Sequence, residues 1–269
     1  MTVEFLHRYD AYLVDVDGVL LRGSEPIAGS VDALTRLAET GRVLLLTNNS
    51  TRSRGQHADC LARLGFRIPP EWILPTSYLA ARYLLDRFGP MSTWVLGEAG
   101  LRQELVDAGH VLAEQPEEAE ALVVGMDRQL DYDRLTAAYR ALAVGARLVA
   151  TNEDGTYPVP GGFHPGAGAM VGALRGMGFS PSAVVGKPSP IAFRMALRAL
   201  GAGSERVVVI GDRLETDIQG GHDAGLDTAV VLSGISSREN IDAFEIRPTW
   251  IADDLAALVR GAVERPPMG

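Results

Sequence analysis

The stretch AYLVDVDGVLLRG, residues 11–23, places two aspartates at the end of an otherwise apolar run. Asp15 and Asp17 are two residues apart, and alternate residues of a strand point to the same side. We expect both acids to be buried at the end of a core strand. Because a buried carboxylate without a partner is costly, the pair requires a cation, hydrogen bonds, or a reaction that uses both acids.

Similar apolar runs recur along the chain and alternate with segments of helical length. The runs are rich in Val, Ile and Leu and mostly continuous, as expected of strands covered on both faces. Several helical segments end in glycine, a frequent C-terminal cap. The pattern predicts an α/β fold with a doubly wound parallel sheet. The runs are AYLVD, RVLLLTN, TWVLG, ALVVGM, ARLVATN, AVVGK, RVVVIGD and DTAVVL.

Polar side chains follow four of these runs, at the point where each run ends. In open α/β sheets, ligands bind in the crevice beyond the carboxyl ends of the strands. The four ends would therefore bring acids, a hydroxyl, an amide and a lysine to one edge of the sheet. In chain order, these side chains are Asp15 with Asp17, Thr47 with Asn48, Lys187, and Asp212.

The spacing of the four ends predicts two domains. The first two ends are about thirty residues apart, as expected of one βαβ unit, and the last two are similarly close. The long interval between them contains strands and helices of its own. We therefore predict a core formed by residues 1–78 and 182–269, interrupted by a second α/β module over residues 79–181.

The predicted site is rich in carboxylate oxygens. Asp15, Asp17, Asp212 and the nearby Asp217 suit a hard cation such as Mg²⁺, which takes oxygen ligands and binds through one or two carboxylates plus phosphate. No HExxH or CxxC pattern is present, which argues against zinc. The sequence therefore favours a magnesium site.

The other polar side chains suit phosphoryl chemistry. Lys187, together with the hydroxyl and amides near Thr47 and Asn48, can neutralise phosphoryl oxygens. An aspartate can attack phosphorus and form an aspartyl-phosphate. A second carboxyl group can protonate the leaving oxygen and then activate water. Because one residue does not easily do both, this chemistry explains why two acids stand together.

Four segments of the chain resemble the motifs of a known enzyme family. DVDGVL, TNNS, GKPSP and GDRLETDI are similar, in order and context, to the four motifs of the haloacid dehalogenase superfamily. The long insertion resembles its large C2-type cap. GMDRQLDYDRL, ATNEDGTYP and PGAGAM resemble the branch with p-nitrophenyl phosphatase and the phosphoglycolate, glycerol-phosphate and nucleotide phosphatases. The resemblance covers nearly the whole chain and implies a Rossmann-like core with an inserted α/β cap.

The resemblance also implies roles for the matching residues. Asp15 is the implied nucleophile, and Asp17 is the implied general acid and base. Mg²⁺ would be held by Asp15, by the backbone carbonyl of Asp17 and by Asp212, with Asp217 supporting the metal shell. The residues implied to bind and balance the phosphoryl group are Thr47, Asn48 and Lys187.

Polar residues of the insertion are candidates for substrate selection. Asp127 and Arg128 follow one apolar run, and Asn152 and Asp154 follow another. Either pair could face the leaving group, or could equally cap a helix or tie a loop. His164 lies in the segment that returns from the insertion, where it would touch substrate without taking part in catalysis.

Composition and charge exclude several classes of protein. The net charge of −9 and the pI of about 5.1 argue against a binder of nucleic acid or membrane surfaces, which needs a basic face. The single cysteine, Cys60, excludes an intramolecular disulfide and has the context of a packing residue. No stretch approaches a membrane span, and no signal peptide is evident. We expect a cytoplasmic protein.

The leading hypothesis is a Mg²⁺-dependent hydrolase of small phosphomonoesters that works through an aspartyl-phosphate. Its candidate substrates are glycerol phosphate, phosphoglycolate, sugar phosphates and nucleoside monophosphates. The alternatives are a receiver-like signalling protein, a phosphometabolite-binding protein without turnover, and a dehalogenase. The dehalogenase needs no acid at Asp17, and the receiver has no inserted cap. A homodimer through the cap would fit the family.

Overall fold

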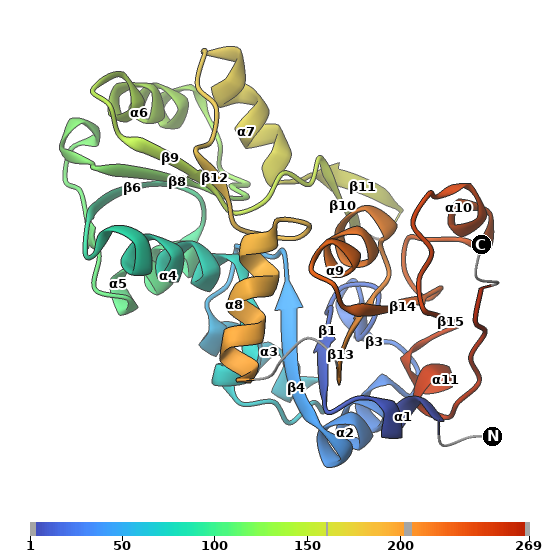
Figure 1. Ribbon diagram of the computed structural model, residues 1–269. Coiled ribbons are helices and arrows are strands. Elements are labelled where there is room, and N and C mark those ends of the chain that lie inside the picture. The colour runs from blue at the N-terminus through green and yellow to red at the C-terminus, as the bar shows by residue number, and fades with distance from the viewer. Residues whose placement is uncertain (1–3, 160, 202–205, 267–269) are drawn as a thin grey trace. The chain divides into compact units, whose positions relative to one another are not determined.

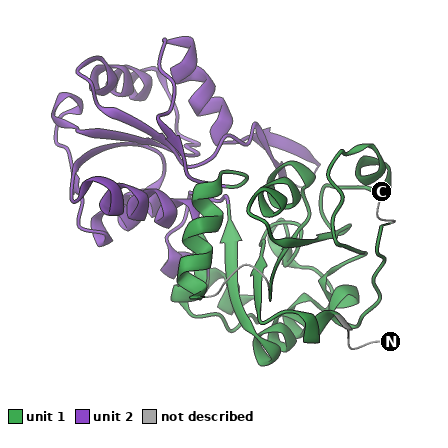
Figure 2. Ribbon diagram, viewed as in Figure 1, with its two compact units in different colours: residues 1–47, 58–74, 187–269 green, residues 48–57, 75–186 purple. Residues whose placement is uncertain are grey.

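The protein is described by a computed structural model that divides into two compact units (Figure 2). Unit 1 comprises residues 1–47, 58–74 and 187–269, and unit 2 comprises residues 48–57 and 75–186. Within the part of the chain that the structure describes, no helix has the length and apolar character needed to cross a bilayer. The described residues are 4–159, 161–201 and 206–266.

A six-stranded sheet forms the centre of unit 1 (Figure 1), in the order β15-β14-β13-β1-β4-β5. β1 lies between β13 and β4 and is parallel to both. All four residues of β1 are buried, which explains its continuous apolar sequence. The strands are β1 (Ala11–Val14), β4 (Arg42–Thr47), β5 (Ile73–Pro75), β13 (Val207–Gly211), β14 (Asp227–Val231) and β15 (Trp250–Ala252).

Apolar clusters lie on both faces of this sheet. Ala229 and Val231 of β14 belong to a large cluster shared with α1, α2 and α11, whereas Val230 between them belongs to a second cluster with η4 and α10. Because neighbouring strand residues point to opposite faces, the sheet is covered on both sides. The elements are α1 (Glu4–Arg8), α2 (Ser30–Thr40), α8 (Pro190–Leu200), η4 (Leu214–Ile218), α9 (Gln219–Asp223), α10 (Arg238–Ala243) and α11 (Leu255–Val259).

Short elements complete unit 1. A small hairpin follows β1, and α3 begins in unit 2 and ends in unit 1. The amphipathic sequence of α2 buries Ala33, Leu34 and Leu37 on one side, as a helical period requires. The elements are β2 (Leu21–Arg22), β3 (Glu25–Pro26), α3 (Arg54–Arg63) and η1 (Pro70–Trp72).

Unit 2 contains its own five-stranded sheet, in the order β12-β9-β8-β6-β7. The neighbouring strands are parallel. α6 and α7 share an apolar cluster with β8 and β9, and Figure 1 shows α4 and α5 on the opposite face. The strands are β6 (Ser92–Leu96), β7 (Val111–Leu112), β8 (Ala121–Val124), β9 (Arg147–Ala150) and β12 (Ala183–Val184).

The remaining elements of unit 2 are helices and one exposed hairpin. In the hairpin, β10 and β11 are antiparallel and place Tyr157 opposite His164. The elements are α4 (Thr76–Phe88), α5 (Ala99–Asp107), η2 (Pro116–Glu118), α6 (Tyr132–Ala143), β10 (Thr156–Val159), β11 (Gly162–Pro165) and α7 (Ala167–Gly176).

The boundaries of the two units differ from the predicted ones. Residues 48–57, which we predicted to be core, are part of unit 2, and unit 2 extends from residue 75 to 186 rather than from 79 to 181. Hydrogen bonds explain the difference at the first segment, because the carbonyl of Asn48 accepts from Thr76 and Asn152. The assignment of the units as core and cap stays a prediction.

The strand before Lys187 also differs from its predicted place. The run AVVGK contains β12, which pairs with β9 in the sheet of unit 2 and not with a strand of unit 1. Lys187 therefore does not follow a core strand, but is the first residue of unit 1 after unit 2. A strand of two residues carries too little sequence to indicate which sheet it joins.

Two helical glycines of unit 2 give a matched test of its packing. A Cβ on Gly100 would lie 2.2 Å from the backbone of Arg52, whereas a Cβ on Gly172 meets nothing within 4 Å. Gly100→Ala should therefore lower the free energy of unfolding by about 1–3 kcal/mol through overpacking. Gly172→Ala should raise it by up to about 1 kcal/mol, because alanine favours the helix. Urea unfolding followed by circular dichroism measures both, and equal effects would contradict this packing.

Candidate active site

Asp15 is the first residue after β1 and is almost completely buried, with 8% of its surface exposed. Its backbone amide donates to the carbonyl of Ile210, so the pairing with β13 continues as far as Asp15. Asp17, in contrast, is exposed. The expectation that both acids are buried is therefore wrong for Asp17, because the chain turns away from the sheet directly after Asp15.

Lys187 lies between two buried carboxylates of unit 1. Its ammonium nitrogen donates to Oδ1 of Asp15 and to Oδ1 of Asp217, both at 2.6 Å. Burial by itself would lower the pKa of Lys187, but the two carboxylates outweigh burial and hold that pKa above its ordinary value. The lysine is therefore charged, and each aspartate has the partner that its burial requires.

The amino-acid composition also singles out Lys187, independently of its position behind an apolar run. The chain contains 25 lysine and arginine residues, and Lys187 is the only lysine among them. Arginine presents a planar fork of donors, whereas lysine presents a compact ammonium on a flexible stem. A single nitrogen that bonds two carboxylates at 2.6 Å needs the ammonium. The single lysine of the chain therefore occupies a position whose geometry arginine does not fit.

Three carboxylates of unit 1 form a group that suits a divalent cation. Oxygens of Asp15, Asp212 and Asp217 lie within 4.8 Å of one another, and all three residues are buried. Burial raises the pKa of Asp212 to about 7, and the charge of Asp217 adds to the shift. Burial likewise raises the pKa of Asp15, although Lys187 opposes the shift. One ammonium does not balance three buried carboxylates, so an added hard cation fits this donor set.

Asp217, which is predicted to support the metal shell, has its carboxylate in the same group as those of Asp15 and Asp212. The side chain of Asp17, for which the backbone carbonyl is the predicted ligand, is not in this group. Asp212 accepts a hydrogen bond from the backbone amide of Ile235, which orients its carboxylate. A Cβ on Gly18 or Gly234 would lie 2.3 or 1.9 Å from Asp212, so only glycine allows both loops to approach it.

Thr47 and Asn48 are neighbours in sequence but belong to different units. Thr47 ends β4 and is buried, and the register that pairs Val14 with Leu45 directs Asp15 and Thr47 to the same edge of the sheet. The side-chain amide of Asn48 donates to Asp154 of unit 2 at 3.0 Å. The motif TNNS therefore continues from the sheet of unit 1 into the hydrogen bonds of unit 2.

Three of the candidate selectivity residues tie loops within unit 2. The buried carboxylate of Asp127 accepts from the amide of Gln129 and pairs with Arg134. Asn152 donates to the carbonyl of Asn48 and accepts from the amide of Asp154. These contacts favour the structural alternative for Asp127, Asn152 and Asp154. The other two candidates have exposed side chains.

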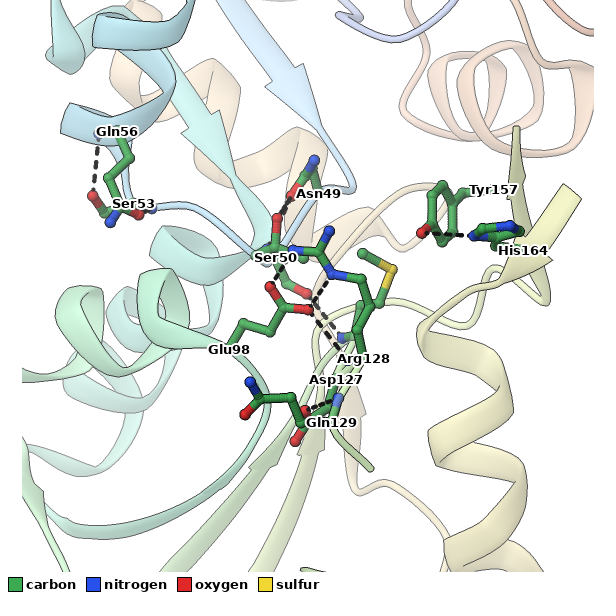
Figure 3. A network of polar contacts seen from close by, with 12 residues as sticks. Asn49, Ser50, Ser53, Gln56, Glu98, Asp127, Arg128, Gln129, Tyr157 and His164 are labelled. Carbon is green, nitrogen blue, oxygen red and sulfur yellow. Dashed lines mark hydrogen bonds and ion pairs between the residues drawn. The ribbon is translucent and has the colours of Figure 1, made fainter. Parts of the chain in front are cut away.

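Arg128 and His164 are those exposed candidates, and both have partners that were not predicted from the sequence (Figure 3). Glu98 accepts two hydrogen bonds from the Arg128 guanidinium, at 2.7 and 2.6 Å. These bonds hold the pKa of Glu98 below its ordinary value. The ring of His164 meets that of Tyr157 edge-on across the hairpin. Only tertiary structure pairs residues thirty positions apart, so no local pattern indicates Glu98.

Comparison with known proteins identifies the family. A family model described as haloacid dehalogenase-like hydrolase matches residues 12–111, and one described as HAD-hydrolase-like matches residues 184–258. Together they cover both segments that carry the carboxylate group. The chain belongs to the haloacid dehalogenase-like hydrolases. The predicted family and the α/β fold class are thereby confirmed.

Individual relatives place the chain among the phosphatases of this family. It is 35% identical to a dihydroxyacetone phosphatase of Corynebacterium glutamicum, over 92% of this chain and 90% of the relative. A solved p-nitrophenyl phosphatase from Archaeoglobus fulgidus is similar with a TM-score of 0.88 and 35% identity, over 93% of this chain and 98% of that one. A glycerol phosphate phosphatase from Mycobacterium tuberculosis was solved with magnesium. It is similar with a TM-score of 0.87 and 34% identity, over 94% of this chain and 77% of that one.

The Lys187 contacts generate a prediction about stability. Lys187→Met removes the ammonium and leaves Asp15 and Asp217 facing each other without compensation. In EDTA at neutral pH, we expect the free energy of unfolding to fall by about 3–5 kcal/mol. Urea unfolding measures this change, and the double variant Lys187→Met/Asp217→Asn should recover part of it. A single variant as stable as the parent would show that the ammonium does not compensate these acids.

Proposed function

We propose that the chain hydrolyses small organic phosphomonoesters through an aspartyl-phosphate on Asp15. The observation that carries the proposal is the buried Asp15 carboxylate at the end of β1, bonded to Lys187 and grouped with Asp212 and Asp217. The names of the relatives, which include dihydroxyacetone, acid sugar, glycerol phosphate and 5'-nucleotide phosphatases, support this reaction class. Phosphates of small polyols are the proposed substrates.

The proposed reaction has two displacements at phosphorus. A carboxylate oxygen of Asp15 attacks phosphorus, the ester P–O bond breaks, and Asp17 gives its proton to the leaving alkoxide. Asp17 then takes a proton from water, whose oxygen attacks the phosphorus of the aspartyl-phosphate. Inorganic phosphate leaves and the Asp15 carboxylate is restored. The exposure of Asp17 supports its role, because the side chain must be accessible to the leaving group and to the attacking water.

The remaining residues would hold the phosphoryl group and its charge. Thr47 and Asn48 donate hydrogen bonds to phosphoryl oxygens, and Lys187 balances their charge. Mg²⁺ would be held by Asp15, by the carbonyl of Asp17 and by Asp212, with Asp217 in support. When bound, the ion offsets phosphoryl charge that would otherwise repel the Asp15 carboxylate. The buried, under-compensated carboxylates support this assignment.

Unit 2 is the proposed cap that selects the leaving group. Arg128 and His164 are the stronger candidates, because their side chains are exposed while those of Asp127, Asn152 and Asp154 are held by loop contacts. Glu98 neutralises much of the charge of Arg128 through two hydrogen bonds. This pairing supports leaving groups with neutral hydroxyls over leaving groups with a second anionic group.

Asp15→Asn tests the nucleophile. We expect phosphate release from a panel of phosphomonoesters to fall by at least about a thousandfold, because an amide does not attack phosphorus. EDTA should abolish release by the parent and Mg²⁺ should restore it. Asp10→Asn is the matched control, since Asp10 is exposed and pairs only with Arg206 among the described ion pairs. Substantial release by Asp15→Asn would refute the assignment. If the parent protein releases no phosphate from any substrate of the panel, the result would favour a binding protein.

Asp17→Asn tests the general acid and base, and p-nitrophenyl phosphate separates its two roles. Its leaving group needs little protonation, so the first step should remain fast while hydrolysis of the aspartyl-phosphate becomes slow. We expect a burst of about one p-nitrophenol per enzyme, followed by slow turnover. Glycerol phosphate should give no burst, because its alkoxide requires the proton. Parent-like steady rates on both substrates would exclude this role.

A further inference from the structure

A cavity of about 280 Å³ lies within unit 2, beside the free edge of β6. β7 pairs with β6 only at Ser92 and Thr93, so the strand edge is open from Trp94 onward. There the carbonyl of Val95 accepts a hydrogen bond from Nη2 of Arg102, at 3.1 Å. The backbone edge, the side chain of Arg102 and the first turns of α6 line the cavity.

The positive charge of Arg102 is not neutralised by a carboxylate. Among the described residues, its guanidinium enters no ion pair, and the bond to Val95 uses one of its five N–H donors. Arg134, on the α6 side of the cavity, already pairs with Asp127. Arg102 is therefore the guanidinium of the lining that has no carboxylate within ion-pair distance among the described residues.

The pKa of Arg102 lies below its ordinary value. Burial is the main cause that lowers the pKa, and the like charge of Arg134 lowers it further, whereas Asp127 opposes the shift only in part. Asp131 and Asp133 also line the cavity, but both are exposed, so that water screens their charge. An anion placed against Arg102 would contact the half-buried guanidinium directly, whereas the two exposed carboxylates would act on it through water.

The lining of the cavity also includes apolar groups. Trp94 is half-buried and packs against the apolar cluster of α6 and α7, and Ala137 of α6 also belongs to the lining. Pockets for small molecules usually measure about 300–1,000 Å³ and combine apolar walls with a few polar groups. This cavity lies just below that range, so it suits a compact ligand with one anionic group and one flat apolar group.

We infer that unit 2 carries a second ligand site, for a small organic carboxylate whose anionic group binds Arg102 and whose apolar part lies against Trp94. The site shares no residue with the Asp15–Lys187 group and does not depend on the proposed reaction. An aromatic carboxylate of the size of benzoate fits the volume and the chemistry of the walls.

Fluorine NMR of protein labelled with 5-fluorotryptophan tests the site. The chain has three tryptophans, Trp72, Trp94 and Trp250, and Trp94→Phe assigns the resonance of interest. Titration with benzoate should shift the Trp94 resonance with a Kd on the order of 1 mM, while the other two resonances stay in place. Benzamide, which has the same shape without the charge, should bind at least about tenfold more weakly.

Arg102→Gln is the decisive variant, because glutamine can still donate to Val95 but has no charge. It should weaken benzoate binding at least about tenfold, and Arg102→Lys should weaken it less. Arg140→Gln is the matched control, since Arg140 lies on α6 but pairs with Glu117 away from the cavity lining. Its Kd should stay within about twofold of the parent. Parent-like binding by Arg102→Gln, or no shift of Trp94 at tens of millimolar benzoate, would overturn the inference.

Discussion

The pairing of the Lys187 ammonium with Asp15 and Asp217 is the contact on which the site depends. It joins three distant parts of the chain: the end of the central strand β1, the first residue after unit 2, and the turn η4. Without it, two buried carboxylates would face each other in a medium that strengthens their repulsion. The contact therefore allows unit 1 to bury the carboxylates that a divalent cation requires.

The segment that follows β4 links this charge to the second unit. Thr47 ends the strand, and the next residue, Asn48, bonds residues of unit 2 through its side chain and its carbonyl. One short motif therefore serves both units. A substitution that loosens the packing of residues 48–57 would disturb unit 2 and the proposed phosphoryl-binding residues together, since a single stretch of backbone positions both.

Charge in unit 2 distinguishes structural arginines from candidate functional ones. Arg134 pairs with the buried Asp127, and Arg128 pairs with Glu98, so the charge of each guanidinium is balanced by a carboxylate. Among the described residues, the partner of Arg102 is a backbone carbonyl and not a carboxylate. A guanidinium that is half-buried and lacks a carboxylate can still compensate an incoming anion, whereas a paired one must first lose its partner. This difference separates the proposed second site from the selectivity residues of the proposed cap.

The sequence by itself determined the α/β class, because continuous apolar runs are a local pattern. Its resemblance to four family motifs indicated the family and pointed to Asp15, Lys187, Asp212 and Asp217, because these motifs are short local segments. Tertiary structure alone decided which sheet β12 joins, that Asp17 is exposed while Asp15 is buried, and that Glu98 holds Arg128. Periodicity and spacing specify an element and its ends. Side-chain pairing and burial depend on which distant segments meet in the fold. The local sequence of a two-residue strand or around a single acid does not indicate which segments these are.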